Sequence, residues 1–132
     1  MDASEATVRE FIARINSHDV EGIITLCAHA HRFVDGLGQV LTGYDQLRAA
    51  WSGYFYLFPD YRIDIESLAV AGEVVLAASS ASATAAAGTP TAQRWRIPAA
   101  WRAEVRGGLL VLWQVYADNE PIREIMRRGG PQ

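Results

Sequence analysis

The stretch QRWRIPAAWRAEVRGGLLVLWQVYADNEPI, residues 93–122, decides the fold, because it has the pattern of two long strands joined by a tight glycine turn. In its first half, apolar side chains occupy alternate positions: Trp95, Ile97, Ala99, Trp101, Ala103 and Val105. Arginine and glutamate fill most positions between them, which is typical of a strand with one buried face. Gly107 and Gly108 predict the reversal into a second strand, 109–118. That strand is nearly all apolar but ends on Asp118, an unusual place for a carboxylate.

Helical segments are predicted upstream of this hairpin. Apolar residues recur at helical spacing in residues 4–17, 20–27 and 44–58. The T-x-x-D sequence of residues 42–45 predicts a side-chain cap for the third helix. Cys27 lies on the apolar face of the second helix and is predicted to be a buried structural thiol.

The remaining segments alternate with the period of strands. Residues 29–35 predict a short strand that enters a glycine loop, and residues 61–70 predict a strand with a bulge near Ser67. Residues 74–87 predict a strand of small side chains, and a short final helix is expected at 122–128. Helices followed by strands predict an α+β domain, in which three N-terminal helices cover one face of a curved antiparallel or mixed sheet. Such a sheet forms a cone whose interior has room for a ligand.

Length and composition limit the classes of function. A chain of 132 residues predicts one domain, 1–132, with an ordered core of about 4–128. The net charge is -3 and lysine is absent, which argues against nucleic acid and anionic membranes as partners. A single cysteine excludes an internal disulfide. Residues 1–10 lack a secretory pattern and no apolar run approaches ~20 residues, so we expect a cytoplasmic protein.

Two carboxylates are candidates for acid–base chemistry, and each has a structural alternative. Asp35 follows an apolar strand and precedes Gly36 and Gly38, so it is a general base or acid at the cone, or an acceptor for backbone N–H groups of its loop. Asp118 is a second acid–base group, or the cap of the final helix. If both face one cavity, they could divide the base and acid roles.

Histidines and aromatic rings complete the predicted site. His29 and His31 share a predicted strand face with Asp35, a spacing compatible with a metal. The chain offers no second ligand cluster, so we expect no metal and interpret His31 as a pocket residue or proton relay. The rings exceed what a filled core of this size needs, which favours an apolar pocket. These rings are Trp51, Tyr54, Phe55, Phe58, Trp95, Trp101, Trp113 and Tyr116.

The chain resembles the nuclear transport factor 2-like superfamily, and within it the SnoaL-like polyketide cyclase and ketosteroid isomerase branch. The resemblance lies in VREFIARINSHDVEGI, HRFVDGLGQVLTGYDQLRAAW, FPDYRIDI and WRIPAAWRAEVRGGLLVLWQVYADN. It implies a cystatin-like, nuclear transport factor 2-like α+β barrel. Asp35 is similar in placement to the general base of ketosteroid isomerases, and Asp118 to the acid–base aspartate of cyclases after W-x-x-x-x-D. The two oxyanion donors of the isomerases fall at Phe11 and Ala99, which predicts against classical steroid isomerisation.

The resemblance also implies which side chains face the substrate: Trp51, Trp95, Trp101, Leu112, Gln114 and Tyr116. Our first hypothesis is therefore a cofactor-independent isomerase, cyclase or lyase acting on a hydrophobic, carbonyl-bearing small molecule. The alternative is a non-catalytic domain that binds a ligand or forms dimers. Arg94, Arg96, Arg102 and Glu104 on the outer sheet face would suit a homodimer contact, as the resemblance also implies.

Overall fold

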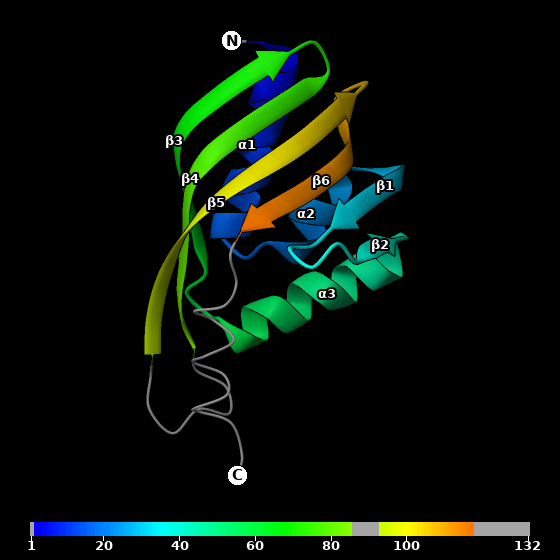
Figure 1. The fold of residues 1–132 in the computed structure, drawn as a ribbon. Helices are drawn as coiled ribbons and strands as arrows, with labels where there is room; N and C mark the ends of the chain where they lie inside the picture. Colours follow the sequence, from blue (N-terminus) through cyan, green and yellow to red (C-terminus); the bar gives the residue numbers. More distant parts are fainter. Residues whose placement is uncertain (1, 86–92, 118–132) are drawn as a thin grey trace.

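The computed structural model describes residues 2–85 and 93–117, whose arrangement is shown in Figure 1. The elements are, in order, α1 (Ala3–Asn16), α2 (Val20–Thr25), β1 (Cys27–Val34), β2 (Val40–Thr42), α3 (Tyr44–Leu57), β3 (Arg62–Ala71), β4 (Val74–Ala85), β5 (Gln93–Arg106) and β6 (Leu109–Ala117). The three expected helices and the five expected strands are confirmed, and β2 is an element that the sequence pattern did not predict. The final helix expected at 122–128 lies outside the described residues.

The six strands form one mixed sheet in the order β2-β1-β6-β5-β4-β3. Strands β1 and β6 pair in parallel, and every other neighbouring pair is antiparallel. Figure 1 shows the long strands β4 and β5 bending around the helices. The α+β class and the curved sheet are therefore confirmed, although the described strands do not close into a barrel.

The helices cover one face of the sheet, and the core lies between them. Helix α1 buries the predicted stripe (Val8, Phe11, Ile12 and Ile15). The alternating residues of β5 bury the predicted face (Trp95, Ile97, Ala99, Trp101, Ala103 and Val105). The turn between β5 and β6 is formed by Gly107 and Gly108, which both have positive φ, as the glycine pair predicted. The half-buried hairpin predicted from the sequence is therefore confirmed.

Two irregularities change which side chains face the core. The register of β3 against β4 shifts between Ile65 and Ser67, where a bulge was predicted. A second shift, between Glu104 and Val105 of β5, leaves Val111 of β6 without an opposite residue. The extra residue in β6 changes the phase of the alternation, so that Leu110 and Trp113 both belong to the core.

Two details of the predicted helices were wrong. Cys27 is buried as expected, but it is the first residue of β1 and not part of a helical face. The third helix has Gly43 at its N-cap and makes no side-chain cap bond from the predicted T-x-x-D sequence. The side chain of Gln46 instead reaches back and accepts the backbone N–H of Thr42 at 2.7 Å. Glycine serves there because its φ of 84° is one that other residues rarely adopt.

The corner between α1 and α2 clamps the beginning of β3. The Asn16 amide donates to the Ile63 carbonyl at 3.0 Å, and its oxygen accepts the Ile63 N–H at 2.8 Å. His18 Nε2 donates to the Tyr61 carbonyl at 2.8 Å, while its ring stacks on Phe55 with centroids 4.1 Å apart. These contacts fix where the chain leaves α3 and enters the sheet. None of the helices in the described residues is long and apolar enough to cross a membrane.

Candidate functional site

A cavity of about 390 Å³ lies between α3 and the inner face of the sheet. Its size falls in the range of small-molecule sites. Rings and small side chains form most of its wall: Phe33, Leu37, Leu41, Ala50, Trp51, Tyr54, Tyr61, Ala81, Trp95, Ile97, Ala99, Trp101, Trp113, Val115 and Ala117, with Asp35 and Gly36. Within the sheet, each of Trp95 and Trp101 is paired with an alanine, Ala83 and Ala77, so small side chains lie beside these rings on the inner face.

Four of the predicted substrate-binding residues lie in this wall: Trp51, Tyr54, Trp95 and Trp101. Trp51 and Tyr54 come from α3, three residues apart and therefore on the same helical face. Trp95 and Trp101 come from the buried face of β5. The sequence periodicity assigned these residues to the buried face of a helix and to the buried face of a strand, and in the structure the two faces line the same cavity.

Asp35 is the only charged residue among those that line the cavity within the described part of the chain. Its Oδ1 accepts the backbone N–H groups of Leu37 at 2.9 Å and Gln39 at 3.0 Å. The same loop is closed by the Asp35 N–H donating to the Gln39 carbonyl at 3.0 Å. The alternative in which Asp35 accepts loop N–H groups is therefore confirmed, and its half-buried carboxylate also borders the cavity.

His31 lies in the core and is not part of the cavity wall. Its side chain is only 1% exposed, and its ring lies 6.4 Å from the ring of Phe11. The Nδ1–H donates to the Leu110 carbonyl at 2.9 Å, which leaves Nε2 without a partner among the described residues. Burial lowers the pKa of His31, while the bond to Leu110 opposes that shift. A position beside Asp35 in the pocket, as expected for a proton relay, is not what the structure shows.

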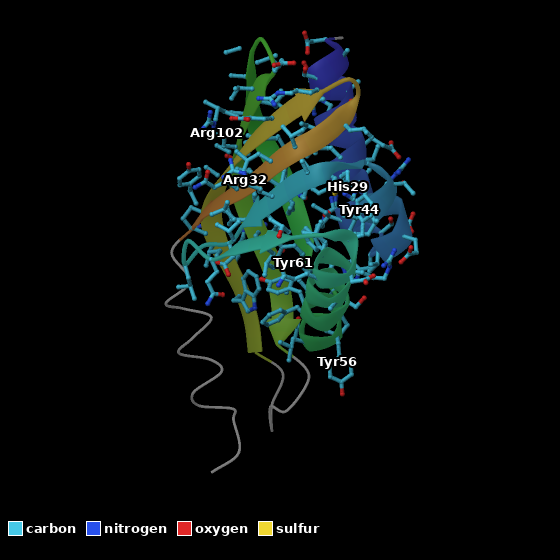
Figure 2. The ribbon with its side chains drawn as sticks, turned by 90° about the vertical axis from the view of Figure 1, so that its right-hand side faces the viewer. His29, Arg32, Tyr44, Tyr56, Tyr61 and Arg102 are labelled. Atoms are coloured by element: carbon cyan, nitrogen blue, oxygen red, sulfur yellow. The ribbon has the colours of Figure 1, made fainter. Side chains whose placement is uncertain are left out.

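His29 points away from His31. The register of β1 against β6 shifts between Cys27 and Arg32, and this irregularity breaks the alternation that put both histidines on one face. His29 is exposed and packs edge-on against Tyr44 with centroids 5.8 Å apart. The two residues are labelled next to each other in Figure 2. Within residues 2–85 and 93–117, no three His, Cys, Asp or Glu side chains are grouped so that they could hold a metal ion.

Three predicted substrate-binding residues, Leu112, Gln114 and Tyr116, do not line the cavity. Their neighbours Trp113, Val115 and Ala117 do, and adjacent residues of a strand point to opposite faces. Tyr116 is 51% exposed, whereas Leu112 is buried. The expectation that these three side chains form the pocket wall is therefore corrected. Asp118, the other predicted acid–base residue, lies outside the described residues.

The wall also contains groups that the sequence interpretation did not single out. Tyr61 lines the cavity from the corner between α3 and β3, and burial raises its pKa well above the ordinary value. Burial also raises the pKa of Tyr54, so both phenols remain protonated at neutral pH. The signal for Tyr61 was present in the sequence. Tyr61 begins the alternation continued by Ile63 and Ile65, so the pattern predicts that its side chain points the same way as the inward face of β3.

The sequence profile of one family, the SnoaL-like domain, matches residues 8–113. A comparison with curated proteins finds no match. Among solved structures, a candidate SnoaL-like polyketide cyclase from Shewanella denitrificans OS-217 superposes with a TM-score of 0.86 and 11% identity, over 96% of this chain and 98% of that one.

Two further structures show the same architecture. AclR, a candidate hydroxylase from Streptomyces galilaeus, has a TM-score of 0.79 and 18% identity, over 97% of this chain and 87% of its own. A protein with a ketosteroid isomerase-like fold from Catenulispora acidiphila DSM 44928, solved with trimethylamine, has a TM-score of 0.75 and 20% identity, over 95% of this chain and 93% of its own. At such identities the likeness establishes the fold, and it confirms the resemblance drawn from the sequence.

Proposed function

The chain belongs to the SnoaL-like domain family, and we propose that it is an acid–base enzyme for a hydrophobic, carbonyl-bearing small molecule held in the aromatic cavity. The observation that carries this proposal is a carboxylate, Asp35, bordering a cavity whose wall is otherwise apolar or aromatic. A ring system fits such a wall by packing on Trp51, Trp95 and Trp101. A carboxylate beside the bound ring can remove a proton next to the carbonyl.

The hydrogen bonds of Asp35 define how it would act. Oδ1 is held by the N–H groups of Leu37 and Gln39, so the carboxylate has a fixed orientation. Oδ2 makes no hydrogen bond to the described residues and is the oxygen available to a substrate proton. We assign the second proton-transfer role to Asp118, which the family resemblance singles out.

The test uses 2-tetralone, a bicyclic ketone with exchangeable protons next to its carbonyl. Exchange of these protons for deuterium in D2O, followed by NMR, measures base catalysis without knowledge of the natural substrate. Asp35→Asn is a matched variant, because its amide oxygen can still accept both loop N–H groups while the base is lost. We expect exchange to fall by about 100-fold or more with Tm unchanged. Exchange by Asp35→Asn and Asp118→Asn at the wild-type rate would refute the acid–base proposal.

The second candidate is a non-catalytic ligand-binding domain of the same fold. It is favoured by the two loop bonds to Asp35 Oδ1, which give that residue a structural purpose without chemistry. Under this alternative, 2-tetralone raises Tm but its protons exchange no faster than in buffer. The two candidates therefore differ in one measurement on the same sample.

The outer face of the sheet is the proposed homodimer contact. Leu76 and Tyr116 are 52% and 51% exposed there, and the pair Arg102–Glu104 adds a salt bridge of 2.8 Å. Leu76 lies opposite Arg102 in the register of β4 and β5, so apolar and charged groups share one surface. Sedimentation of the wild type and of Leu76→Glu tests the contact, since a buried glutamate would shift a dimer to monomers. A wild-type chain that sediments as a monomer at high concentration contradicts it.

A further inference from the structure

Tyr54 and Tyr61 are neighbours in the cavity wall. Tyr54 lies near the end of α3, and Tyr61 lies just before β3. Their rings are perpendicular, at 89°, with centroids 4.9 Å apart. Each ring is also supported from behind: Tyr54 by Phe58 at 4.9 Å and Tyr61 by Trp95 at 6.1 Å. The two phenols are thus adjacent and held by packing.

Neither phenol hydroxyl makes a hydrogen bond to another described residue. Enclosed polar atoms without a partner do exist in the described chain, including Trp51 Nε1 and Trp95 Nε1, but the two phenol oxygens are not among them. The hydroxyls of Tyr54 and Tyr61 are therefore not fully enclosed by protein atoms, and both residues line the cavity. By contrast, the hydroxyl of Tyr44 donates to the Cys27 carbonyl at 3.2 Å.

The two hydroxyls are suited to donate. Burial raises the pKa of both phenols, so they keep their protons. The backbone of Tyr61 is fixed by His18 Nε2 on its carbonyl at 2.8 Å and by its own N–H on the Phe58 carbonyl at 3.0 Å. Donors that are already oriented bind an acceptor without first losing much conformational freedom.

The charge of the wall selects the kind of acceptor. Among the described lining residues there is no Arg, Lys or His, and Asp35 is the charged group. An anionic ligand would meet a carboxylate and no counter-charge, whereas a neutral carbonyl needs only hydrogen-bond donors. The wall therefore favours uncharged ligands with an oxygen acceptor at one end.

We propose that Tyr54 and Tyr61 form a two-hydroxyl site that binds the carbonyl oxygen of a neutral cyclic ketone. This inference rests on the proposed function, because it places the carbonyl of the substrate for which Asp35 is the base. Tyr61 is labelled beside α3 in Figure 2.

The experiment compares 2-tetralone with tetralin, which has the same ring skeleton and no oxygen. Dissociation constants are measured by quenching of tryptophan fluorescence for the wild type, Tyr54→Phe, Tyr61→Phe and the double variant. Phenylalanine keeps the ring contacts and removes only the hydroxyl. Tyr56→Phe is the matched control, since Tyr56 is 75% exposed and Figure 2 shows it projecting from α3 away from the body of the protein.

We expect the wild type to bind 2-tetralone more tightly than tetralin. Each single variant should lose about 2- to 10-fold in affinity for the ketone, as expected for one neutral hydrogen bond. The double variant should reverse the preference, because an unpaired carbonyl is costly to desolvate. The affinity for tetralin should be the same in all variants, and Tyr56→Phe should bind both ligands as tightly as the wild type does.

The outcomes separate this inference from the proposed function. Equal affinity of the wild type for both ligands, or unchanged ketone affinity in the double variant, overturns the two-hydroxyl site. If Asp35-dependent proton exchange is observed alongside either result, the proposed function stands without it. If neither 2-tetralone nor tetralin binds, both the two-hydroxyl site and the proposed function are overturned.

Discussion

Replacement of Asn16 by alanine should destabilise the protein by about 2 kcal/mol. Asn16 makes two hydrogen bonds with the backbone of Ile63, at 2.8 and 3.0 Å, and a typical net contribution is about 1 kcal/mol each. Ile63 is only 2% exposed, so water does not freely replace the lost partners. A loss of this size is a large fraction of the stability of an ordinary domain.

The assay is urea unfolding followed by tryptophan fluorescence, with the free energy of unfolding obtained by linear extrapolation. Asn16→Asp is the informative comparison. Its carboxylate still accepts the Ile63 N–H but faces the Ile63 carbonyl without a proton to donate. When the side chain is protonated it becomes a donor again, so the folded state favours the protonated form. The deficit of this variant relative to wild type should therefore shrink as the pH is lowered.

Two results would refute this reasoning. A loss below about 0.5 kcal/mol for Asn16→Ala would mean that the two bonds add little beyond what water supplies. A deficit of Asn16→Asp that does not change with pH would mean that its side chain does not face the Ile63 carbonyl. An unchanged m-value is the control that the same folded and unfolded states are being compared.

Three further outcomes follow from the described side chains. Because burial lowers the pKa of His31 in the folded state, protonation of this residue favours the unfolded chain. Above about pH 6.5 its titration should cost no stability, and the free energy of unfolding should fall as the pH drops below that value. His31→Asn, which can still donate to Leu110, should lack this component of the pH profile of Tm. Burial raises the pKa of the Cys27 thiol to about 12, so iodoacetamide should label it only after denaturation; rapid native labelling would contradict its burial. Ala81→Leu should lower 2-tetralone affinity at least about tenfold without lowering Tm, because the added carbons fill existing space; unchanged affinity would place the ligand elsewhere.

Local periodicity was sufficient to predict most of the architecture. Strand β5 alternates tryptophan and alanine with arginine, so its buried face follows from the pattern alone. The bulge near Ser67 was also visible, because the apolar phase changes there. Strand β2 was missed because three residues after a glycine loop are too short to show a period, and it exists through its pairing with β1.

The site was predicted less completely, for reasons that involve tertiary structure. Leu112, Gln114 and Tyr116 were assigned to the pocket by family resemblance, whereas simple alternation from Trp113 places them on the other face. The two histidines of β1 were assigned to one face on the assumption of regular alternation. The irregularity that breaks this alternation arises from the pairing of β1 with β6, which is far away in the sequence: His31 and its partner Leu110 are 79 residues apart. No local pattern contains that information.

Among the described strands, β2 and β3 lie at the edges of the sheet, and each carries a feature that discourages pairing with another molecule. Strand β2 is three residues long, which offers little for a foreign strand to extend. On β3, the Asn16 amide occupies the backbone donor and acceptor of Ile63, just as an invading strand would. The Arg62–Asp64 pair, 2.8 Å apart, places charge beside it. The clamp that fixes the start of β3 therefore also blocks this edge at Ile63, so we expect Asn16→Ala to aggregate more readily than wild type as well as to be less stable.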